Sequence, residues 1–291
     1  MFKHFIVATD LSPASFAVVN CLGALRACGA EQCLLLQSLT YREAASTALS
    51  YHTEPIEGML KEQKEFLEKE GFAVEARIVV GSPKQEVTRI ASEEDYSLIV
   101  VGAQGHSLVA ERLLGGVAYG IIHNTKKPVL VVPVENKPGE EDACEPVSRR
   151  GFNDHVLFAT DFSEIADNAF TFVEQLVANG ARKVTLVHVQ DKVKLEKHLK
   201  ERLEEFNRID HGRLEELKER LLKKGGPYIE IEIRYGKPFE EITRLVREHN
   251  VQLVVMGTQG RSFAGELFLG SVSHNVARSS VAPVLLIPAV R

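Results

Sequence analysis

Short apolar runs alternate with longer amphipathic stretches along the whole chain. The first run, within residues 3–9, leads into a helical pattern that stops at Gly29, and the run CLLLQSL follows. Apolar residues at helical spacing then cover 41–71, and the remaining runs of this half are AVEARIVVG, LIVVGAQG and VLVVP. Strands that alternate with helices are typical of a parallel sheet with right-handed crossovers and helices on both faces.

The same succession occurs a second time. Ala-Thr-Asp-x-Ser at 8–12 recurs at 159–163, and each tetrad precedes a helical pattern that its serine can cap. Compared at an offset of 155, residues 98–133 and 253–288 share 14 identities in 36 positions, including three glycines. Similar buried strands would match Val with Leu, but they would not reproduce this glycine spacing. The sequence therefore predicts two repeated doubly wound domains, each with a five-stranded parallel sheet.

The segment between the two copies is polar, with two prolines and clustered acidic residues. This composition, over residues 135–151, is typical of a linker. The predicted domains are therefore 1–134 and 152–291, each of ordinary domain size.

Composition excludes several classes of partner. A formal net charge of -5 argues against a nucleic-acid partner, and no apolar run approaches the length of a membrane span. The four cysteines form no CxxC pair and the N-terminus is too polar for a signal peptide, so we expect reduced thiols and a cytoplasmic protein. The ten histidines show no local ligand spacing, and we expect no metal site.

The stretch 253–288 carries the main functional signal. The apolar run Leu253–Met256 ends at Gly257, then Gly260 follows, and Gly270-Ser271 precedes a helical pattern. Glycine lets a ligand approach the backbone closely, and the N–H groups at a helix start favour an anion. The spacing therefore indicates a loop that holds phosphate.

The expected strand order places further groups beside this loop. In an open parallel sheet, ligands bind beyond the carboxyl ends of the strands where the strand order reverses. Asp161, Val189 and Gly257 end the first, second and fourth strands, so they border one crevice if the first and fourth strands are neighbours. A carboxylate there can accept from ribose hydroxyls, with the base towards Val189 and Met256. We therefore predict a nucleotide site.

Structural explanations exist for the same residues. Asp10 and Asp161 can instead cap a helix or bond within the turn, and both roles can coexist. The glycines can form tight turns without a ligand. Arg261 and His106 can be solvated loop residues, which is the interpretation that we prefer for His106.

Both halves closely resemble the universal stress protein family in a tandem, two-domain arrangement. Residues 257–271 fit the pattern G-x2-G-x9-G-[S/T] of its nucleotide-binding members. The resemblance implies an adenine-nucleotide α-hydrolase-like, Rossmann-like fold that binds ATP or AMP, with magnesium only alongside ATP. It also implies that backbone groups at Val189 recognise adenine. The residues implied to bind the nucleotide are Ala159, Thr160, Asp161, Val189, Met256, Gly257, Gln259, Gly260, Arg261, Gly270, Ser271, Val272 and Ser273.

The first half departs from this pattern. Gly116 stands where the second half has Ser271, Ala118 replaces Ser273, and Ser38 replaces Val189. Two hydroxyl donors are lost, each worth about 0.5–1.5 kcal/mol, while the backbone amides persist. We therefore expect a weaker site formed by Ala8, Thr9, Asp10, Ser38, Gly102, Gln104, Gly105, Gly115, Gly116 and Val117.

These features favour a nucleotide-binding sensor or binding module of the stress response, without catalytic residues. The alternative is a slow ATPase or nucleotide hydrolase, but the loop lacks a lysine and Glu266 is its only carboxylate. A phosphoacceptor switch is excluded, because the third strand ends in glycine and Pro133 and Pro288 close the fifth strands. A flavin electron-transfer role stays open.

The resemblance also implies pairing within the chain. The fifth strands VLVVP and VLLIP are expected to pack across a pseudo-two-fold axis, so that one chain forms an intramolecular pseudo-dimer. Whether two chains associate further as a homodimer is left open.

Overall fold

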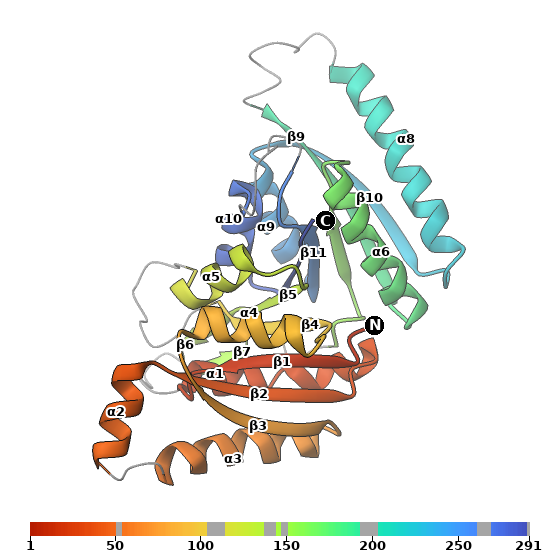
Figure 1. Cartoon of the computed structure of the whole chain (residues 1–291). Helices are drawn as coiled ribbons and strands as arrows, with labels where there is room; N and C mark the ends of the chain where they lie inside the picture. Colours follow the sequence, from red (N-terminus) through yellow and green to blue (C-terminus); the bar gives the residue numbers. More distant parts are fainter. Residues whose placement is uncertain are drawn as a thin grey trace. The chain divides into compact units, whose positions relative to one another are not determined.

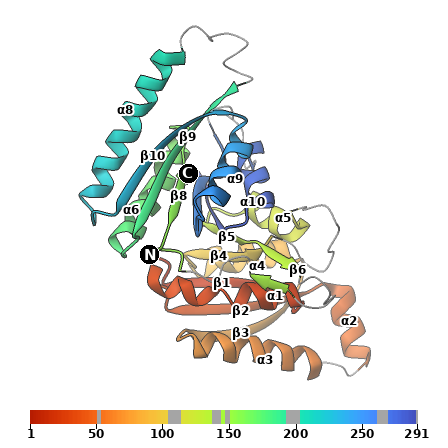
Figure 2. The same cartoon turned by 180° about the vertical axis from the view of Figure 1, so that it is seen from behind.

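The chain folds into two compact units, Met1–Arg149 and Arg150–Arg291. The computed structural model describes residues 1–50, 54–103, 114–136, 144–146, 151–192, 203–260 and 269–289. Figures 1 and 2 show the two units from opposite sides. The bounds predicted above, 1–134 and 152–291, stay a prediction.

Unit 1 is a parallel sheet with the strand order β5-β4-β1-β2-β3. Helices α1 and α3 contact one face of this sheet and α4 contacts the other. The elements in chain order are β1 (His4–Thr9), α1 (Pro13–Val19), the 3-10 helix η1 (Leu22–Cys28), β2 (Gln32–Leu39), α2 (Tyr41–Ser50), α3 (Glu54–Lys69), β3 (Ala73–Val80), α4 (Pro83–Glu93), β4 (Leu98–Gly102), α5 (Gly116–Asn124), β5 (Val129–Val132), β6 (Val134–Asn136) and β7 (Cys144–Pro146).

Unit 2 repeats this architecture with the strand order β10-β9-β8-β11-β12. Helices α6 and α8 cover one face of its sheet, and α9 and α10 lie on the other (Figure 1). The elements are β8 (Val156–Ala159), α6 (Glu164–Ala178), β9 (Lys183–Asp191), α8 (Leu203–Leu222), β10 (Tyr228–Gly236), α9 (Pro238–Glu248), β11 (Leu253–Gly257), α10 (Ser271–Ser279) and β12 (Val284–Ile287). The predicted fold class, two repeated doubly wound domains with five-stranded parallel sheets, is confirmed.

The first helix of unit 1 is shorter than its sequence pattern predicts. The helical pattern up to Gly29 divides into α1, which ends at Val19, and the 3-10 helix η1. Asn20 and Gly23 fall at this division, and both residue types are poor helix formers. The corresponding positions of unit 2 are Thr171 and Glu174, and this stretch forms the continuous helix α6.

The polar segment predicted as a linker contains regular structure. Strands β6 and β7 pair in antiparallel fashion, and both contact α1. Alternating side chains let such a short pair place one face against a helix while the other stays polar.

The cysteines that the structure describes with their side chains are buried thiols. Cys21, Cys28 and Cys33 form no disulfide. Burial raises the pKa of Cys21 and that of Cys28 to about 12, so both stay protonated at neutral pH. These three side chains therefore act as small apolar core residues.

Across the described ranges, none of the helices combines the length and the apolar composition needed to span a bilayer.

The end of α8 offers a test of the packing in unit 2. Leu221 is fully buried while its neighbour Leu222 is 48% exposed, because α8 presents only one face to the sheet. We expect Leu221→Ala to lower the free energy of unfolding by about 2–5 kcal/mol. Leu222→Ala should change it by no more than about 0.5 kcal/mol. Urea titration followed by circular dichroism measures both, and equal effects would contradict this placement of α8.

Candidate functional site

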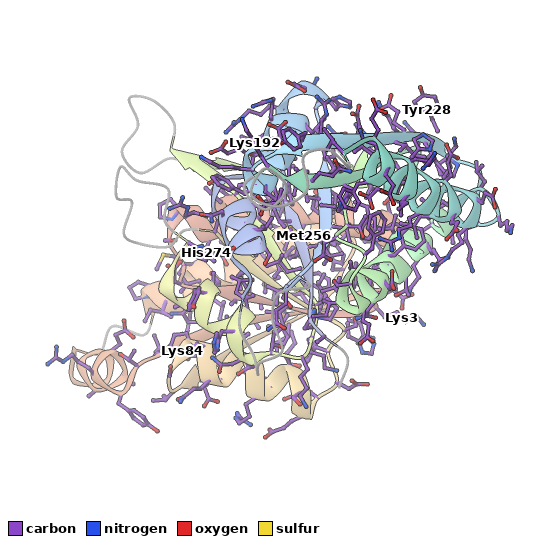
Figure 3. The ribbon with its side chains drawn as sticks, turned by 90° about the horizontal axis from the view of Figure 1, so that it is seen from above. Lys3, Lys84, Lys192, Tyr228, Met256 and His274 are labelled. Atoms are coloured by element: carbon purple, nitrogen blue, oxygen red, sulfur yellow. The ribbon has the colours of Figure 1, made fainter. Side chains whose placement is uncertain are left out.

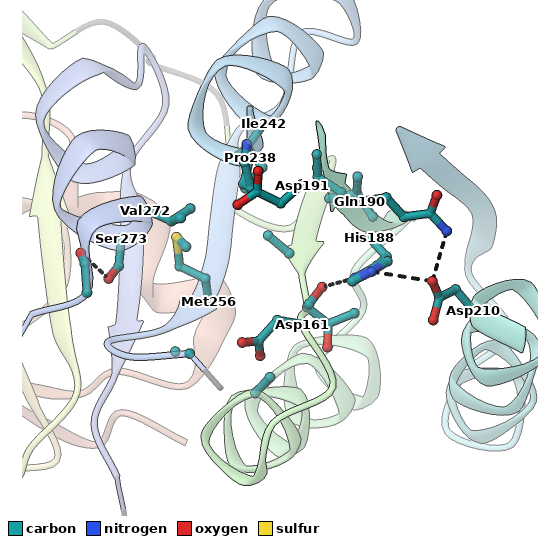
Figure 4. Close-up of a pocket in the computed structure, with 18 of the residues that line it drawn as sticks. Asp161, His188, Gln190, Asp191, Asp210, Pro238, Ile242, Met256, Val272 and Ser273 are labelled. Atoms are coloured by element: carbon teal, nitrogen blue, oxygen red, sulfur yellow. Dashed lines mark hydrogen bonds and ion pairs between the residues drawn. The ribbon is translucent and has the colours of Figure 1, made fainter. Parts of the chain in front are cut away.

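A cavity of about 710 Å³ opens at the carboxyl end of the unit 2 sheet. It lies where β8 and β11 are neighbours, which is the reversal point of the strand order. Residues at the ends of β8, β9 and β11, at the starts of α9 and α10, and on α8 line it (Figure 4). Its volume is in the range of small-molecule sites.

The turn after β8 explains why the chain repeats Ala-Thr-Asp-x-Ser. Thr160 Oγ1 accepts from the Phe162 N–H at 2.9 Å, and Asp161 Oδ1 accepts from the Ser163 N–H at 3.1 Å. These bonds hold Phe162 at a φ of 58°, in the left-handed region. Ser163 then caps α6 by accepting from the Ala166 N–H. The capping predicted for this serine is confirmed, and the bond within the turn weighed for Asp161 is present.

Apolar side chains form one wall of the cavity. Met256 at the end of β11 and Val272 on α10 lie on one side, and Pro238 and Ile242 of α9 lie above them in Figure 4. Ala159 extends this apolar lining at the end of β8. Such a surface suits a flat hydrophobic ring better than a charged group.

Backbone groups of β9 face the same space. The Thr160 N–H donates to the Val187 carbonyl at 3.0 Å, so Val187 directs its backbone groups towards β8. Groups along a strand alternate in direction, so Val189 directs its N–H and C=O to the same side. Strand β8 has already ended at Ala159. The backbone of Val189 therefore points into the cavity rather than at a neighbouring strand.

The glycines after β11 are needed for space rather than for unusual backbone angles. A Cβ on Gly257 would lie 2.8 Å from Ile165 Cγ2, and one on Gly260 would collide with Asp161 Oδ2. Gly270 has an ordinary extended backbone with a φ of -62°. The loop after β11 therefore packs directly on the turn after β8 because these residues have no side chain.

The start of α10 supplies the N–H groups expected for an anion. Gly270 is the N-cap and provides no side chain to cap the helix. The first-turn amides of Ser271, Val272 and Ser273 have no partner within the helix, as at any helix start. Burial and the charge of Arg278 lower the pKa of His274 in the next turn, so this imidazole is neutral at neutral pH. The attraction for an anion at this end therefore comes from the helix itself.

Ser273 holds the loop in place. Its hydroxyl donates to the Thr258 carbonyl at 2.6 Å and lies 3.0 Å from the Gly270 carbonyl. The Gly270 N–H also donates to the Thr258 carbonyl, at 2.8 Å. The single hydroxyl proton is therefore engaged within the protein, and Ser273 shapes the loop instead of offering a donor to the cavity.

A polar network lines the side of the cavity nearest α8. His188 Nδ1 lies 2.8 Å from the Thr160 carbonyl, which can only accept, so this nitrogen carries the proton. His188 Nε2 lies 3.5 Å from Asp210 Oδ2, and Gln190 Nε2 donates to the same oxygen at 3.0 Å (Figure 4). Arg213 approaches Asp210 and stacks over the Phe162 ring at 5.2 Å.

Gln190 leaves one acceptor at this side of the cavity. Its Oε1 is buried and has no hydrogen-bond partner among the residues that the structure describes. Turning the amide over would set this oxygen against the Asp210 carboxylate, so the orientation is fixed by the network. A ligand with a hydrogen-bond donor would satisfy the unpaired atom.

The structure brings the predicted residues of the second half together around this one cavity. Arg261 lies outside the described residues; the others line the cavity, and their role in binding stays a prediction. The lining residues that the sequence analysis missed are Ala166, Val187, His188, Gln190, Asp191, Phe206, Ile209, Asp210, Arg213, Pro238 and Ile242.

Two of these lining residues could have been predicted from the sequence. His188 and Gln190 flank Val189 on the same strand end, so extending the prediction along the strand would have found them. Phe206, Asp210 and Arg213 share one helical face by spacing, but only the packing of α8 shows that this face meets the cavity.

The predicted residues of unit 1 occupy corresponding ends of its elements. Asp10 Oδ1 accepts from the N–H and hydroxyl of Ser12 and from the Ser15 hydroxyl, and Thr9 Oγ1 donates to Gln63 at 2.9 Å. The Ser38 hydroxyl donates to the Gly81 carbonyl. Ala8 and Thr9 end β1, Gly102 ends β4, Gly115 caps α5, and Gly116 and Val117 begin it. Gln104 and Gly105, like His106, lie outside the described residues.

Comparison with known proteins adds an independent finding. The sequence model of the universal stress protein family matches residues 1–133 and 153–288. A universal stress protein of Mycobacterium tuberculosis is 35% identical over 142 residues, which cover 45% of this chain and 96% of that protein. One from Methanocaldococcus jannaschii is 31% identical over 150 residues, which cover 45% and 93%.

Solved structures give a similar result. A universal stress protein from Archaeoglobus fulgidus aligns over 99% of both chains, with a TM-score of 0.71 and 25% identity. A universal stress protein solved in complex with cAMP is 29% identical and aligns over 45% of this chain and 97% of that one, with a TM-score of 0.37.

The role of Ser273 in shaping the loop can be tested against its neighbour. Ser273→Ala removes the bond to the Thr258 carbonyl, and we expect it to lower the free energy of unfolding by about 0.5–1.5 kcal/mol. Ser271 is exposed at the helix start, so Ser271→Ala should change stability by no more than about 0.5 kcal/mol. Urea titration compares the two variants, and an equal loss in both would count against this role.

Proposed function

The chain belongs to the universal stress protein family, and from this premise we propose that unit 2 binds an adenine nucleotide, ATP or AMP. In this proposal the protein acts in the cytoplasm as a nucleotide sensor or binding module of the stress response. The observation that carries the proposal is the cavity at the carboxyl end of the unit 2 sheet, which combines an apolar wall, a carboxylate at the end of β8 and the uncapped start of α10.

The apolar end of the cavity supports a base as the first part of the ligand. Met256 and Ala159 offer surfaces for a ring, and the backbone of Val189 points into the same space. A strand offers both an N–H donor and a carbonyl acceptor, which matches the adenine edge with its ring nitrogen and exocyclic amine.

Other groups that line the cavity support a ribose phosphate. Asp161 is a carboxylate beside Gly260, where it can accept from ribose hydroxyls. The amides at the start of α10 are directed at the same cavity and favour phosphate oxygens. The cavity therefore offers the three kinds of group that the base, sugar and phosphate of a nucleotide require.

Binding without hydrolysis is the form of the proposal that the site supports best. Hydrolysis of ATP normally requires a lysine or a metal at the transferred phosphate and a positioned water. The described residues that line the cavity include no lysine. Glu266, the carboxylate considered for a hydrolase, lies outside the described residues.

We expect the purified protein to contain, or to bind, about one adenine nucleotide per chain. Mass spectrometry of the nucleotide released from the native protein identifies it. If the protein is purified empty, ATP or AMP at a hundred times its Kd should stabilise it by about 2.7 kcal/mol in thermal unfolding. Cyclic AMP is included as a ligand because a universal stress protein has been solved with it, and GTP tests the choice of base.

Gly270→Val is the control for this experiment. A Cβ added at Gly270 would lie 3.3 Å from both Ser273 Oγ and the Thr258 carbonyl oxygen, so a branched side chain should close the part of the cavity expected to hold phosphate. Absence of nucleotide from the native protein, together with no thermal stabilisation by any adenine nucleotide, would overturn the proposal.

Asp161 and Asp10 form a matched pair that tests which unit binds. Each carboxylate bonds the N–H of the serine two residues on, so Asp161→Ala and Asp10→Ala lose the same turn contact. We expect Asp161→Ala to weaken AMP binding by about tenfold or more, since a bond to a charged group contributes about 1.5–3 kcal/mol. Asp10→Ala should leave the affinity within about twofold, as measured by isothermal titration calorimetry. The reverse ranking would assign the site to unit 1.

A further inference from the structure

Two histidines and a glutamate meet at the end of the unit 2 sheet that lies opposite the cavity. His155 directly precedes β8, Glu230 is near the start of β10, and His249 ends α9. The strands are parallel and the cavity lies at their carboxyl ends, so these residues are at the amino ends. Figure 3 shows Tyr228, the first residue of β10, well apart from Met256 beside the cavity. The cluster is therefore a separate feature.

The three side chains have the spacing of a metal-ligand set. One ligand atom from each lies within 4.8 Å of the other two. His249 Nδ1 and Glu230 Oε2 are 3.4 Å apart. Two atoms bound tetrahedrally to one zinc ion are separated by about 3.4 Å, because each bond is about 2.0–2.2 Å long. A small rotation of the partly exposed Glu230 side chain would bring the three ligand atoms within reach of one ion.

His155 has the tautomer that a metal ligand requires. Its Nδ1 lies 3.1 Å from the His249 carbonyl, which can only accept, so Nδ1 carries the proton. Nε2 is then an acceptor that receives the Thr185 hydroxyl at 2.8 Å, and a metal ion would replace this hydrogen bond. Metal-bound histidines typically donate their other N–H to a carbonyl in this way.

Glu230 supplies the negative charge. Lys183 Nζ lies 2.8 Å from Glu230 Oε2 and 5.6 Å from the Tyr228 ring centroid. An ammonium group therefore sits where an ion would bind, and the lysine must turn aside when the ion enters.

Unit 1 holds a cationic side chain at the corresponding place in the repeat. Its corresponding positions are His4, Glu75 and Glu94. The Arg77 guanidinium bridges the two glutamates at 2.7 Å and 2.6 Å. Unit 2 replaces the second glutamate by His249, and imidazole binds transition metals where a carboxylate pair binds a guanidinium.

We propose that His155, Glu230 and His249 form a binding site for one divalent transition-metal ion of the zinc class. Two imidazoles and a carboxylate suit such an ion, and solvent completes its coordination because Glu230 and His249 are partly exposed. The bound ion would connect the starts of β8 and β10 with the end of α9. The sequence analysis predicted no metal site because it considered only local histidine spacing, and these ligands are far apart in the chain.

The test is a titration with zinc chloride at pH 7.5. The whole chain is used without a tag, after EDTA has removed any bound metal. We expect calorimetry to show one equivalent bound, and cobalt chloride to give the visible absorption bands of a low-coordinate site. Glu230→Gln and His249→Ala should each weaken zinc binding by about tenfold or more. His4→Ala, at the corresponding position of unit 1, is the matched control and should leave zinc binding unchanged.

Lys183→Met separates this site from adventitious binding at surface histidines. It removes the competing ammonium group, so we expect zinc to bind more tightly than to the native chain. Circular dichroism in EDTA checks that each variant folds. If His249→Ala fails to fold, Glu230→Gln alone tests the site, because it keeps the shape of the side chain. A native chain that binds no zinc, or zinc binding that is equal in the native chain and Glu230→Gln, would overturn the proposal.

Discussion

The cavity of unit 2 depends on how strand β8 ends. Thr160 and Asp161 accept the two N–H groups that follow, which turns the chain through the left-handed Phe162 and into a capped helix. A left-handed residue with a side chain costs about 1–2 kcal/mol, and the two side-chain bonds and the cap offset this cost. The turn fixes the Asp161 carboxylate at the reversal point of the strand order.

The loop after β11 is built onto that turn. Gly260 lies so close to Asp161 that any side chain would displace the carboxylate, and Ser273 ties the Thr258 carbonyl to the start of α10. The position of the α10 amides is therefore set by packing against β8 rather than by the loop alone. In unit 2, this dependence couples the glycine spacing after β11 to the Ala-Thr-Asp-x-Ser motif after β8.

Local signals made the fold and much of the cavity predictable. Apolar runs, the recurring tetrad and the glycine register fixed the elements, and parallel topology placed Asp161, Val189 and Gly257 at one crevice. The interaction of α8 with His188 was not predictable, because a charged amphipathic helix shows which face is apolar but not where it packs. Ser273 was interpreted as a phosphate donor because its residue type is suitable, whereas its buried environment directs the proton to Thr258.

At both ends of the sheets, the two units differ in the internal partners of their polar side chains. At the carboxyl end, Ser12 and Ser15 donate hydroxyls to Asp10, whereas Ala166 of unit 2 has no hydroxyl at the position of Ser15. At the amino end, the Arg77 guanidinium bridges Glu75 and Glu94, whereas in unit 2 Lys183 pairs with Glu230 and His249 replaces the second glutamate. A polar group that is saturated by its own chain gains little from a ligand, because each new bond replaces an existing one. Substitutions that change the internal partners of a polar group alter what it can bind without changing the fold, and both differences support the proposals that place binding in unit 2.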